Sequence, residues 1–424
     1  MSSTSSPEPE ALVEDRATRR KRRQRKSRST LLLVAGTALV VLLGGFAAFR
    51  AASPVGAATT TSSLGRHLTV NGSPPSASWP AEGQAAYAIP TFGVSAHSST
   101  QASAPMVSIA KLMTALVVLR DYPLAPGSDG PSITVSPLDV VAATAELSTD
   151  QSNVAITAGE TLTERQLLQG LLVHSGNDYA FLLAELDAGS VPQFLVKMNA
   201  RAAEMRLSST TYDDASGFSP KTVSTPSNQL IVGEEAMSSP FIASTVGLTA
   251  VTLPVAGAMG TYTPFAGTND VVGVKSGLTT EAGGCDLLAL KATVAGRDIL
   301  VYSAVFGQMT GNRLLKAGLV ALQLAREAAA AIVSVPISDP GHPVGTIGWS
   351  SSSSPLIAGA TAAIPGWPGQ RVVTDVTTAH SVVGSLPAGA RAGTLIARSG
   401  RLVATWPLLT TRPINPPGLL DRVV

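Results

Sequence analysis

A serine and a lysine lie three residues apart at the head of an apolar run, in the stretch PMVSIAKLMTAL. In a helix that begins at Ser108, Lys111 would lie one turn further on, on the same face. A serine hydroxyl becomes a good nucleophile when a base takes its proton, and burial or a second cation lets lysine be that base. The backbone N–H of Ser108 would donate to an oxyanion. The pair fits acyl transfer, and it also fits a helix with a serine N-cap and a solvated lysine.

A second polar group, HSGN, interrupts two apolar helical patterns. Thr163 and Gln166 predict a capping box at the start of the first helix, and the second helix follows HSGN directly. Ser175 and Asn177 therefore lie on a short turn between two buried helices. Such a turn is either a plain connection or one wall of a site.

Apolar runs over residues 269–307 are separated by Gly-Gly and Ala-Gly, which predicts successive antiparallel strands. Lys275, Ser276 and Gly277 fall on the first strand. The glycine would let a substrate backbone pair with the strand edge, and the lysine would place a cation in the cleft. The alternative is a lysine that faces solvent.

In this fixed order, S-x-x-K at Ser108, S-x-N at Ser175 and K-S/T-G at Lys275 resemble the signature of penicillin-recognising serine acyl-transferases. The similarity is greatest to the low-molecular-mass D-alanyl-D-alanine carboxypeptidases. It extends over residues 80–330 and includes AAYAIPTFGV, ITVSPLDV, TAGETLTERQLL and DDASGFSP. The resemblance implies removal of the terminal D-alanine from peptidoglycan stem peptides in cell-wall remodelling, with β-lactams as covalent inhibitors. It implies no metal or organic cofactor. The excess of basic residues lies in residues 1–30, so the rest of the chain gives no electrostatic case for a nucleic acid partner.

The resemblance also assigns roles to the matching positions. Ser108 would be the acylated nucleophile, Lys111 its general base, and Ser175 a proton relay to the departing D-alanine amine. The backbone N–H groups of Ser108 and Leu278 would form the oxyanion hole. Substrate would contact Asn177, Lys275, Ser276, Gly277, Leu278 and Arg313.

Several positions depart from the family pattern. Ser276 stands where relatives more often have threonine, and it keeps the hydroxyl that binds carboxylate. The local spacing at Arg313 is shifted by one residue from the carboxylate-binding arginine of relatives. His174 would either tune the pH response or pack at a helix end, and Cys285 is expected to pack in the core. The C-terminal segment has too many prolines for the amphipathic membrane helix of some relatives.

Three other functions remain open. A class A β-lactamase needs a water-activating glutamate between S-x-N and K-S/T-G, and residues 205–233 contain no glutamate. A β-lactam or peptidoglycan sensor would keep the fold without turnover. A D,D-endopeptidase or transpeptidase would keep the chemistry and act on another peptide substrate.

The apolar run LLLVAGTALVVLLGGFAAF at 31–49 carries no charge and would span about 28 Å as a helix. Residues 1–30 contain nine of the 30 Lys and Arg and four of the 28 Asp and Glu. This basic flank predicts a cytoplasmic tail, so the chain after Arg50 would be extracellular. The alternative is a cleaved signal peptide, because small residues follow the run.

The elements that would position these residues suggest an α+β fold. We expect a transpeptidase-like domain at 81–330, an antiparallel sheet flanked by helices, and a small β-rich domain at 331–424. Residues 50–80 are rich in Ser, Thr, Ala, Gly and Pro and predict a flexible linker. A single cysteine excludes an intrachain disulfide. The five histidines are scattered without the spacing of metal ligands, which argues against a metal site.

Overall fold

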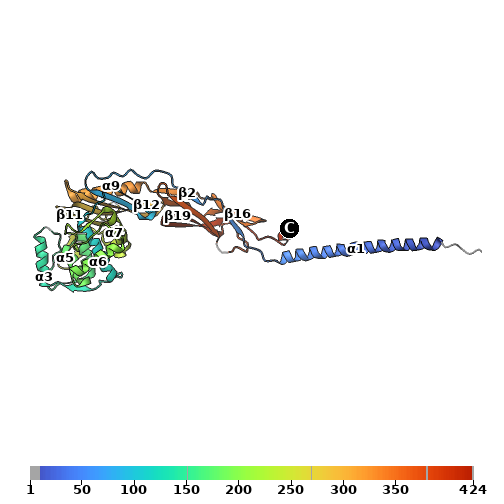
Figure 1. Cartoon of the computed structure of the whole chain (residues 1–424), viewed down its shortest axis with the longest axis horizontal. Helices are drawn as coiled ribbons and strands as arrows, with labels where there is room; N and C mark the ends of the chain where they lie inside the picture. Colours follow the sequence, from blue (N-terminus) through green and yellow to red (C-terminus); the bar gives the residue numbers. More distant parts are fainter. Residues whose placement is uncertain (1–9, 150, 269, 379–380, 423–424) are drawn as a thin grey trace, which may run out of the picture.

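The computed structural model describes residues 10–149, 151–268, 270–378 and 381–422, so residues 1–9 of the predicted basic tail lie outside it. The described chain is elongated, with a mixed α/β lobe, a β-rich region and the long helix α1 (Glu10–Ala52) in a row (Figure 1). The length and composition of α1 fit a membrane span, and a signal sequence near the N-terminus meets the same criteria.

The lobe is built on a five-stranded antiparallel sheet of order β11-β12-β13-β3-β4, which confirms the predicted run of antiparallel strands. Its strands are β3 (Gln84–Ile89), β4 (Val94–His97), β11 (Val271–Thr279), β12 (Gly283–Val294) and β13 (Arg297–Gln308). Helix α9 (Arg313–Ala330) packs on one face. The helical part covers the other face, and β11 is left as an edge strand beside it.

The helical part contains short and medium helices around one apolar core. They are α2 (Lys111–Asp121), α3 (Pro137–Leu147), α4 (Glu164–Gln169), α5 (Asn177–Ala188), α6 (Val191–Glu204), α7 (Pro226–Ser238) and α8 (Pro240–Thr245). Short pairs β5 (Ala104–Pro105) with β8 (Val223–Ser224), β6 (Ser132–Thr134) with β7 (Thr161–Thr163), and β9 (Ala250–Leu253) with β10 (Gly257–Gly260) fasten the connections.

The β-rich region is a seven-stranded sheet of order β1-β15-β16-β20-β19-β18-β2 with its own apolar core. Five of its strands are β15 (Pro343–Trp349), β16 (Ser352–Ala358), β18 (Arg371–Thr378), β19 (Arg391–Ser399) and β20 (Leu402–Thr410). The pair β14 (Val333–Ser338) and β17 (Ala362–Gly366) completes it.

The flexible linker predicted over residues 50–80 is wrong for much of its length. Strands β1 (Thr59–Ser62) and β2 (His67–Thr69) pair with β15 and β18 and form the two edges of the seven-stranded sheet. The segment is short of large apolar residues because edge strands of this kind need few of them, and its Thr-rich pattern supplies backbone pairing instead. The chain thus passes through the β-rich region before it enters the lobe.

The two globular parts meet at a 3₁₀ turn, Pro90–Phe92. Trp367 and Leu402 pack against the core that contains Phe92, and Gln370 Nε2 donates to the Phe92 carbonyl at 2.5 Å. Gly400 has φ +55° and lies so close to Thr91 that a Cβ would be 2.2 Å from its carbonyl oxygen. The contact combines apolar packing with hydrogen bonds and the ion pair between Arg401 and Glu234, and it fixes the lobe on the β-rich region.

Candidate active site

Ser108 lies on a 3₁₀ turn, Val107–Ala110, directly before α2. The predicted α-helix that begins at Ser108 is therefore wrong by three residues. Val107 has φ +47°, and Gly277 on β11 packs so closely that a Cβ there would lie 2.4 Å from Val107 Cγ2 and 2.7 Å from Ser108 N. Gly277 thus makes room for the turn that carries Ser108. This turn lies closer to Gly277 than the substrate backbone that was expected beside the strand. Ser108 is partly exposed, while Val107, Ile109 and Ala110 are buried.

Lys111 is fully buried, so the alternative of a solvated helix lysine is wrong. Its Nζ donates to Ser108 Oγ at 3.0 Å, to Asn177 Oδ1 at 2.5 Å and to the Ser216 carbonyl at 2.8 Å. The three acceptors come from three separate segments and hold the amine beside the serine hydroxyl. A neutral amine in this place can take the hydroxyl proton.

The pKa of Lys111 lies well below its ordinary value. Burial is the largest cause and the charge of Lys275 is the second, while Asp214, Asp178 and Glu146 oppose them. Water no longer solvates the ammonium, and a neighbouring cation makes its charge more costly. Lys111 therefore has the two properties that a lysine base requires, contact with the nucleophile and a depressed pKa.

The turn that carries Ser175 follows α4 and a wider helical turn, Gly170–His174. The capping box predicted for Thr163 and Gln166 is confirmed at the start of α4. Ser175 adopts a left-handed conformation, φ +66°, which ends the helical run and turns its hydroxyl toward β11. Lys275 Nζ donates to Ser175 Oγ at 3.0 Å.

Lys275 is also fully buried, so the solvent-facing alternative is wrong for it as well. Burial lowers its pKa to about 7, and the negative charge of Asp286 opposes that shift. Asp286 stands on β12 directly across from Ser276 in the strand register, and neither carboxylate oxygen has a hydrogen-bond partner among the described residues. Burial raises the pKa of Asp286 well above its ordinary value, and the charge of Lys275 opposes that shift.

Asn177 begins α5 and joins the two polar groups. Besides accepting from Lys111, it donates from Nδ2 to Gln151 Oε1 at 2.6 Å. The side chain is almost completely buried. It holds Lys111 in place, and its amide lies at the same turn as Ser175.

The β11 edge presents the remaining predicted positions. Ser276 Oγ donates to the Tyr262 carbonyl at 3.2 Å, and Leu278 is 43% exposed. Arg313 lies at the start of α9 and reaches the carbonyls of Thr279 and Thr280 at 3.4 Å, just past Leu278. The structure thus brings Ser108, Lys111, Ser175, Asn177 and Lys275 together at this edge, with Arg313 at its far end.

Sequence reasoning missed several supporting residues. Gln151 orients Asn177, the Ser216 carbonyl accepts from Lys111, and Asp178 accepts from the backbone N–H of Val154 at 3.1 Å. Asp214 accepts from the hydroxyls of Ser216 and Thr222 and fixes the loop that carries that carbonyl. The DDASG stretch was the available signal, because two acids beside a buried Ser-Gly are unusual for an exposed loop.

His174 and Cys285, which depart from the family pattern or stand out in the sequence, lie in ordinary packing environments. His174 Nδ1 contacts the Gly260 carbonyl at 2.9 Å, and its ring lies 4.8 Å from that of Tyr262. Cys285 is buried, as expected for a core cysteine, and burial raises the pKa of its thiol to about 12. The thiol is therefore protonated and unreactive at neutral pH.

The comparisons with known proteins agree with this geometry. Residues 94–310 match the family model Peptidase S11, described as D-alanyl-D-alanine carboxypeptidase. A D-alanyl-D-alanine carboxypeptidase of Streptomyces sp. strain K15 is 31% identical over 166 residues, 35% of this chain and 56% of that protein. A D-alanyl-D-alanine endopeptidase of Pseudomonas aeruginosa is 30% identical over 216 residues, 49% of this chain and 65% of that protein. The chain thus spans little more than half the length of these curated relatives.

Among solved structures, penicillin-binding protein 5 of Haemophilus influenzae superposes with a TM-score of 0.54 at 18% identity. The match covers 82% of this chain and all of that one. It shows that the α+β transpeptidase-like fold and the C-terminal β-rich region occur together in both.

Proposed function

The chain belongs to the peptidase S11 family of serine D-alanyl-D-alanine carboxypeptidases and endopeptidases, and from that premise we propose that it is a D,D-carboxypeptidase that removes the terminal D-alanine of peptidoglycan stem peptides. The observation that carries the proposal is the pair of buried lysines that meet around the two serines. Lys111 lies 3.0 Å from Ser108, and Lys275 lies 3.0 Å from Ser175.

In the proposed acylation, neutral Lys111 takes the proton of the Ser108 hydroxyl as Oγ attacks the carbonyl carbon of the penultimate D-alanine. Backbone N–H groups of Ser108 and Leu278 would receive the oxyanion. The C–N bond then breaks, and the proton on Lys111 passes through Ser175 to the departing amine, which leaves Lys111 neutral. Water attacks the ester on Ser108 with Lys111 accepting its proton, Ser108 Oγ takes that proton back as the ester C–O bond breaks, and the shortened peptide leaves.

Substrate binding in this proposal uses the β11 edge. The free C-terminal carboxylate of the peptide would face Lys275, Ser276 and Arg313, and the peptide backbone would run beside Gly277. Protonated Lys275 attracts the carboxylate and disfavours a second charge on Lys111. β-Lactams would acylate Ser108 by the same attack.

We further propose that α1 is a retained single-pass anchor, with the N-terminus in the cytoplasm and the other parts outside the plasma membrane. The catalytic domain would be residues 81–330. The small C-terminal β domain would be 331–424 together with residues 57–70, because β1 and β2 are strands of its sheet. The enzyme would then act on peptidoglycan close to the external face of the plasma membrane.

The test is release of D-alanine from diacetyl-lysyl-D-alanyl-D-alanine by the full chain in neutral detergent. We expect Ser108→Ala to lower release at least about 1,000-fold, because the nucleophile is lost. Ser208→Ala removes an exposed hydroxyl outside the site and serves as the matched control with little change. Equal release by the wild type and Ser108→Ala would contradict the proposal.

The same preparation separates the alternatives. D,D-endopeptidase activity is favoured by relatives of that name and would appear as cleavage of a crosslinked muropeptide dimer without release from the tripeptide. A sensor would bind fluorescent penicillin at Ser108 without turning over either peptide.

A further inference from the structure

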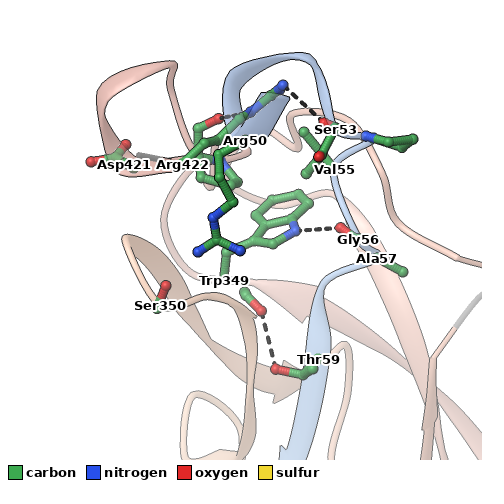
Figure 2. A pocket seen from close by; sticks show the side chains of 13 residues that line it. Arg50, Ser53, Val55, Gly56, Ala57, Thr59, Trp349, Ser350, Asp421 and Arg422 are labelled. Atoms are coloured by element: carbon green, nitrogen blue, oxygen red, sulfur yellow. Dashed lines mark hydrogen bonds between the residues drawn. The ribbon is translucent and has the colours of Figure 1, made fainter. Parts of the chain in front are cut away.

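A pocket of about 330 Å³ lies where α1 meets the β-rich region, far along the molecule from Ser108. It is lined by Arg50 from the end of α1, by residues 53–57, by Trp349 from β15, and by the C-terminal residues Asp421 and Arg422. Figure 2 shows the Arg50 guanidinium extending toward Trp349, while Arg422 reaches over to Ser53. Chain segments from both ends of the sequence therefore build one cationic hollow.

The pocket is held together by specific hydrogen bonds. Arg422 Nη1 donates to the carbonyl of Ala51, in the last turn of α1, at 2.9 Å and to that of Ser53, just after the helix, at 3.3 Å. Trp349 Nε1 donates to the Gly56 carbonyl at 2.7 Å, which fixes the indole as one wall. The C-terminus of the described chain is thus docked on the outer end of the apolar helix.

The charges in the pocket suit one anion. Two guanidinium groups, of Arg50 and Arg422, line the pocket with a single carboxylate, that of Asp421, whose Oδ2 already accepts from the Gly418 backbone N–H at 2.9 Å. Arg422 also donates from Nε to the Pro417 carbonyl at 3.2 Å, so its Nη2 is the donor left for a ligand. Guanidinium groups bind phosphate through paired N–H donors. Arg50 packs over the Phe46 ring, and its guanidinium has no hydrogen-bond partner among the described residues, which leaves its donors for such an anion.

The position of the pocket at the end of the span indicates that the phosphate of a lipid headgroup would be within its reach. Phe49 is the last apolar residue of the 19-residue run, so Arg50 lies at the level where hydrocarbon gives way to headgroups. Beside the pocket, Leu419 and Leu420 are 67% and 84% exposed, and Leu420 is the most exposed of the large apolar side chains in the described chain. Tryptophan is a residue of the same interfacial layer. Lys and Arg are usually enriched on the cytoplasmic side of a span, and Arg50 lies on the outer side in the proposed topology. A contact with a lipid phosphate would account for an arginine at this position.

We propose that this pocket binds the phosphodiester of an anionic phospholipid in the outer leaflet, with Leu419 and Leu420 inserted among the acyl chains. The proposal rests on the retained anchor of the proposed function. Arg50 and Arg422 hold the phosphate, and Trp349 lies at the glycerol level. The β-rich region is thereby seated on the membrane at a second point, beside the span itself.

The experiment uses the full chain in neutral maltoside micelles, titrated with short-chain phosphatidylglycerol. The signal is the Trp emission of the wild type minus that of Trp349→Phe. We expect a saturable change for phosphatidylglycerol, a much weaker one for phosphatidylcholine, and none for inorganic phosphate at the same concentration. Arg50→Gln should raise the half-saturation concentration about tenfold. Arg50→Lys keeps the positive charge, so its half-saturation concentration should lie between those of the wild type and Arg50→Gln.

Arg371→Gln removes an exposed arginine of β18 outside the pocket and is the matched control. Equal responses to the two lipids, or an Arg50→Gln variant that binds as the wild type does, would overturn the proposal. Saturation by inorganic phosphate would assign the pocket to a free anion and overturn the lipid. The intact mass of the chain from native membranes must include Arg50, since cleavage after the span would also overturn it. Penicillin labelling of Ser108 in the same samples tests the proposed function separately.

Discussion

At the residue scale, the proposed mechanism needs the two buried lysines in opposite protonation states. Lys111 must be neutral to accept the Ser108 proton, so the rate rises as pH increases through its depressed pKa. Lys275 must be charged to hold the substrate carboxylate, so the rate falls as pH increases past its pKa of about 7. We therefore expect a bell-shaped profile for acylation of Ser108 by a penicillin, with its alkaline limb beginning near pH 7.

Asp286 gives this expectation a sharper form. Its negative charge raises the pKa of Lys275, so Asp286→Asn should move the alkaline limb to lower pH by about one unit. Stopped-flow acylation with a fluorescent penicillin between pH 5 and 9, on the order of ten points, measures the limb.

Glu164→Gln is the matched control for Asp286→Asn. Glu164 is another fully buried carboxylate with no hydrogen-bond partner among the described residues, and Lys275 is not among the groups that shift its pKa. The control should leave the profile in place. Two profiles that coincide, with only a uniform loss of rate in Asp286→Asn, would show that Asp286 acts through packing alone.

The residues that lie together in the site could be predicted from the sequence more easily than their supports. Motif order pointed to Ser108, Lys111, Ser175 and Lys275, since each motif alone also fits an ordinary helix or strand. Gln151 had no motif, because its value depends on a contact with Asn177 that only the folded chain creates.

At the element scale, α4 positions the turn that carries Ser175. Its capping box joins Thr163 and Gln166, so Thr163→Ala should lower the free energy of unfolding by about 1 kcal/mol. Ser190 is an N-cap residue of α6 whose side chain makes no cap hydrogen bond, and Ser190→Ala should change it far less. Urea unfolding of both variants is the measurement. Equal losses would mean that the α4 cap is not a source of stability.

Elements with a local periodic pattern were predictable, and elements defined by distant partners were not. The capping box and the Ala-Gly strand break at 295–296 are local signals, and both are found in the fold, whereas the Gly-Gly pair falls on the first residues of β12 instead of between strands. Strands β1 and β2 pair with residues of the C-terminal third of the chain, and nothing in their Thr-rich sequence indicates which partner they take. The 3₁₀ turn at Ser108 likewise depends on Gly277, which lies far along the chain.

At the scale of the whole molecule, the segment that contains β1 and β2 is part of the β-rich region and contributes to its stability. A chain that begins at residue 75 loses both edge strands of the seven-stranded sheet, together with the core residues Ala58 and Val70. We expect trypsin to digest the β-rich region of that fragment while the lobe still labels with penicillin, because the lobe has its own core. A fragment that begins at residue 53 should resist trypsin as the full chain does. Equal resistance of both fragments would contradict the structural role of β1 and β2.

The pairing of β1 with β15 also sets an order of events during folding. Thr61 and Thr346 are 285 residues apart in sequence, and their side chains meet across that pair. The loop closed by this contact encloses the entire lobe, and contacts of such high sequence separation form late. In the proposed topology, the segment nearest the membrane would therefore stay unpaired during export until almost the whole chain has emerged. The lobe would acquire its structure first, and the region that the proposed anchor attaches to the cell surface would be completed last.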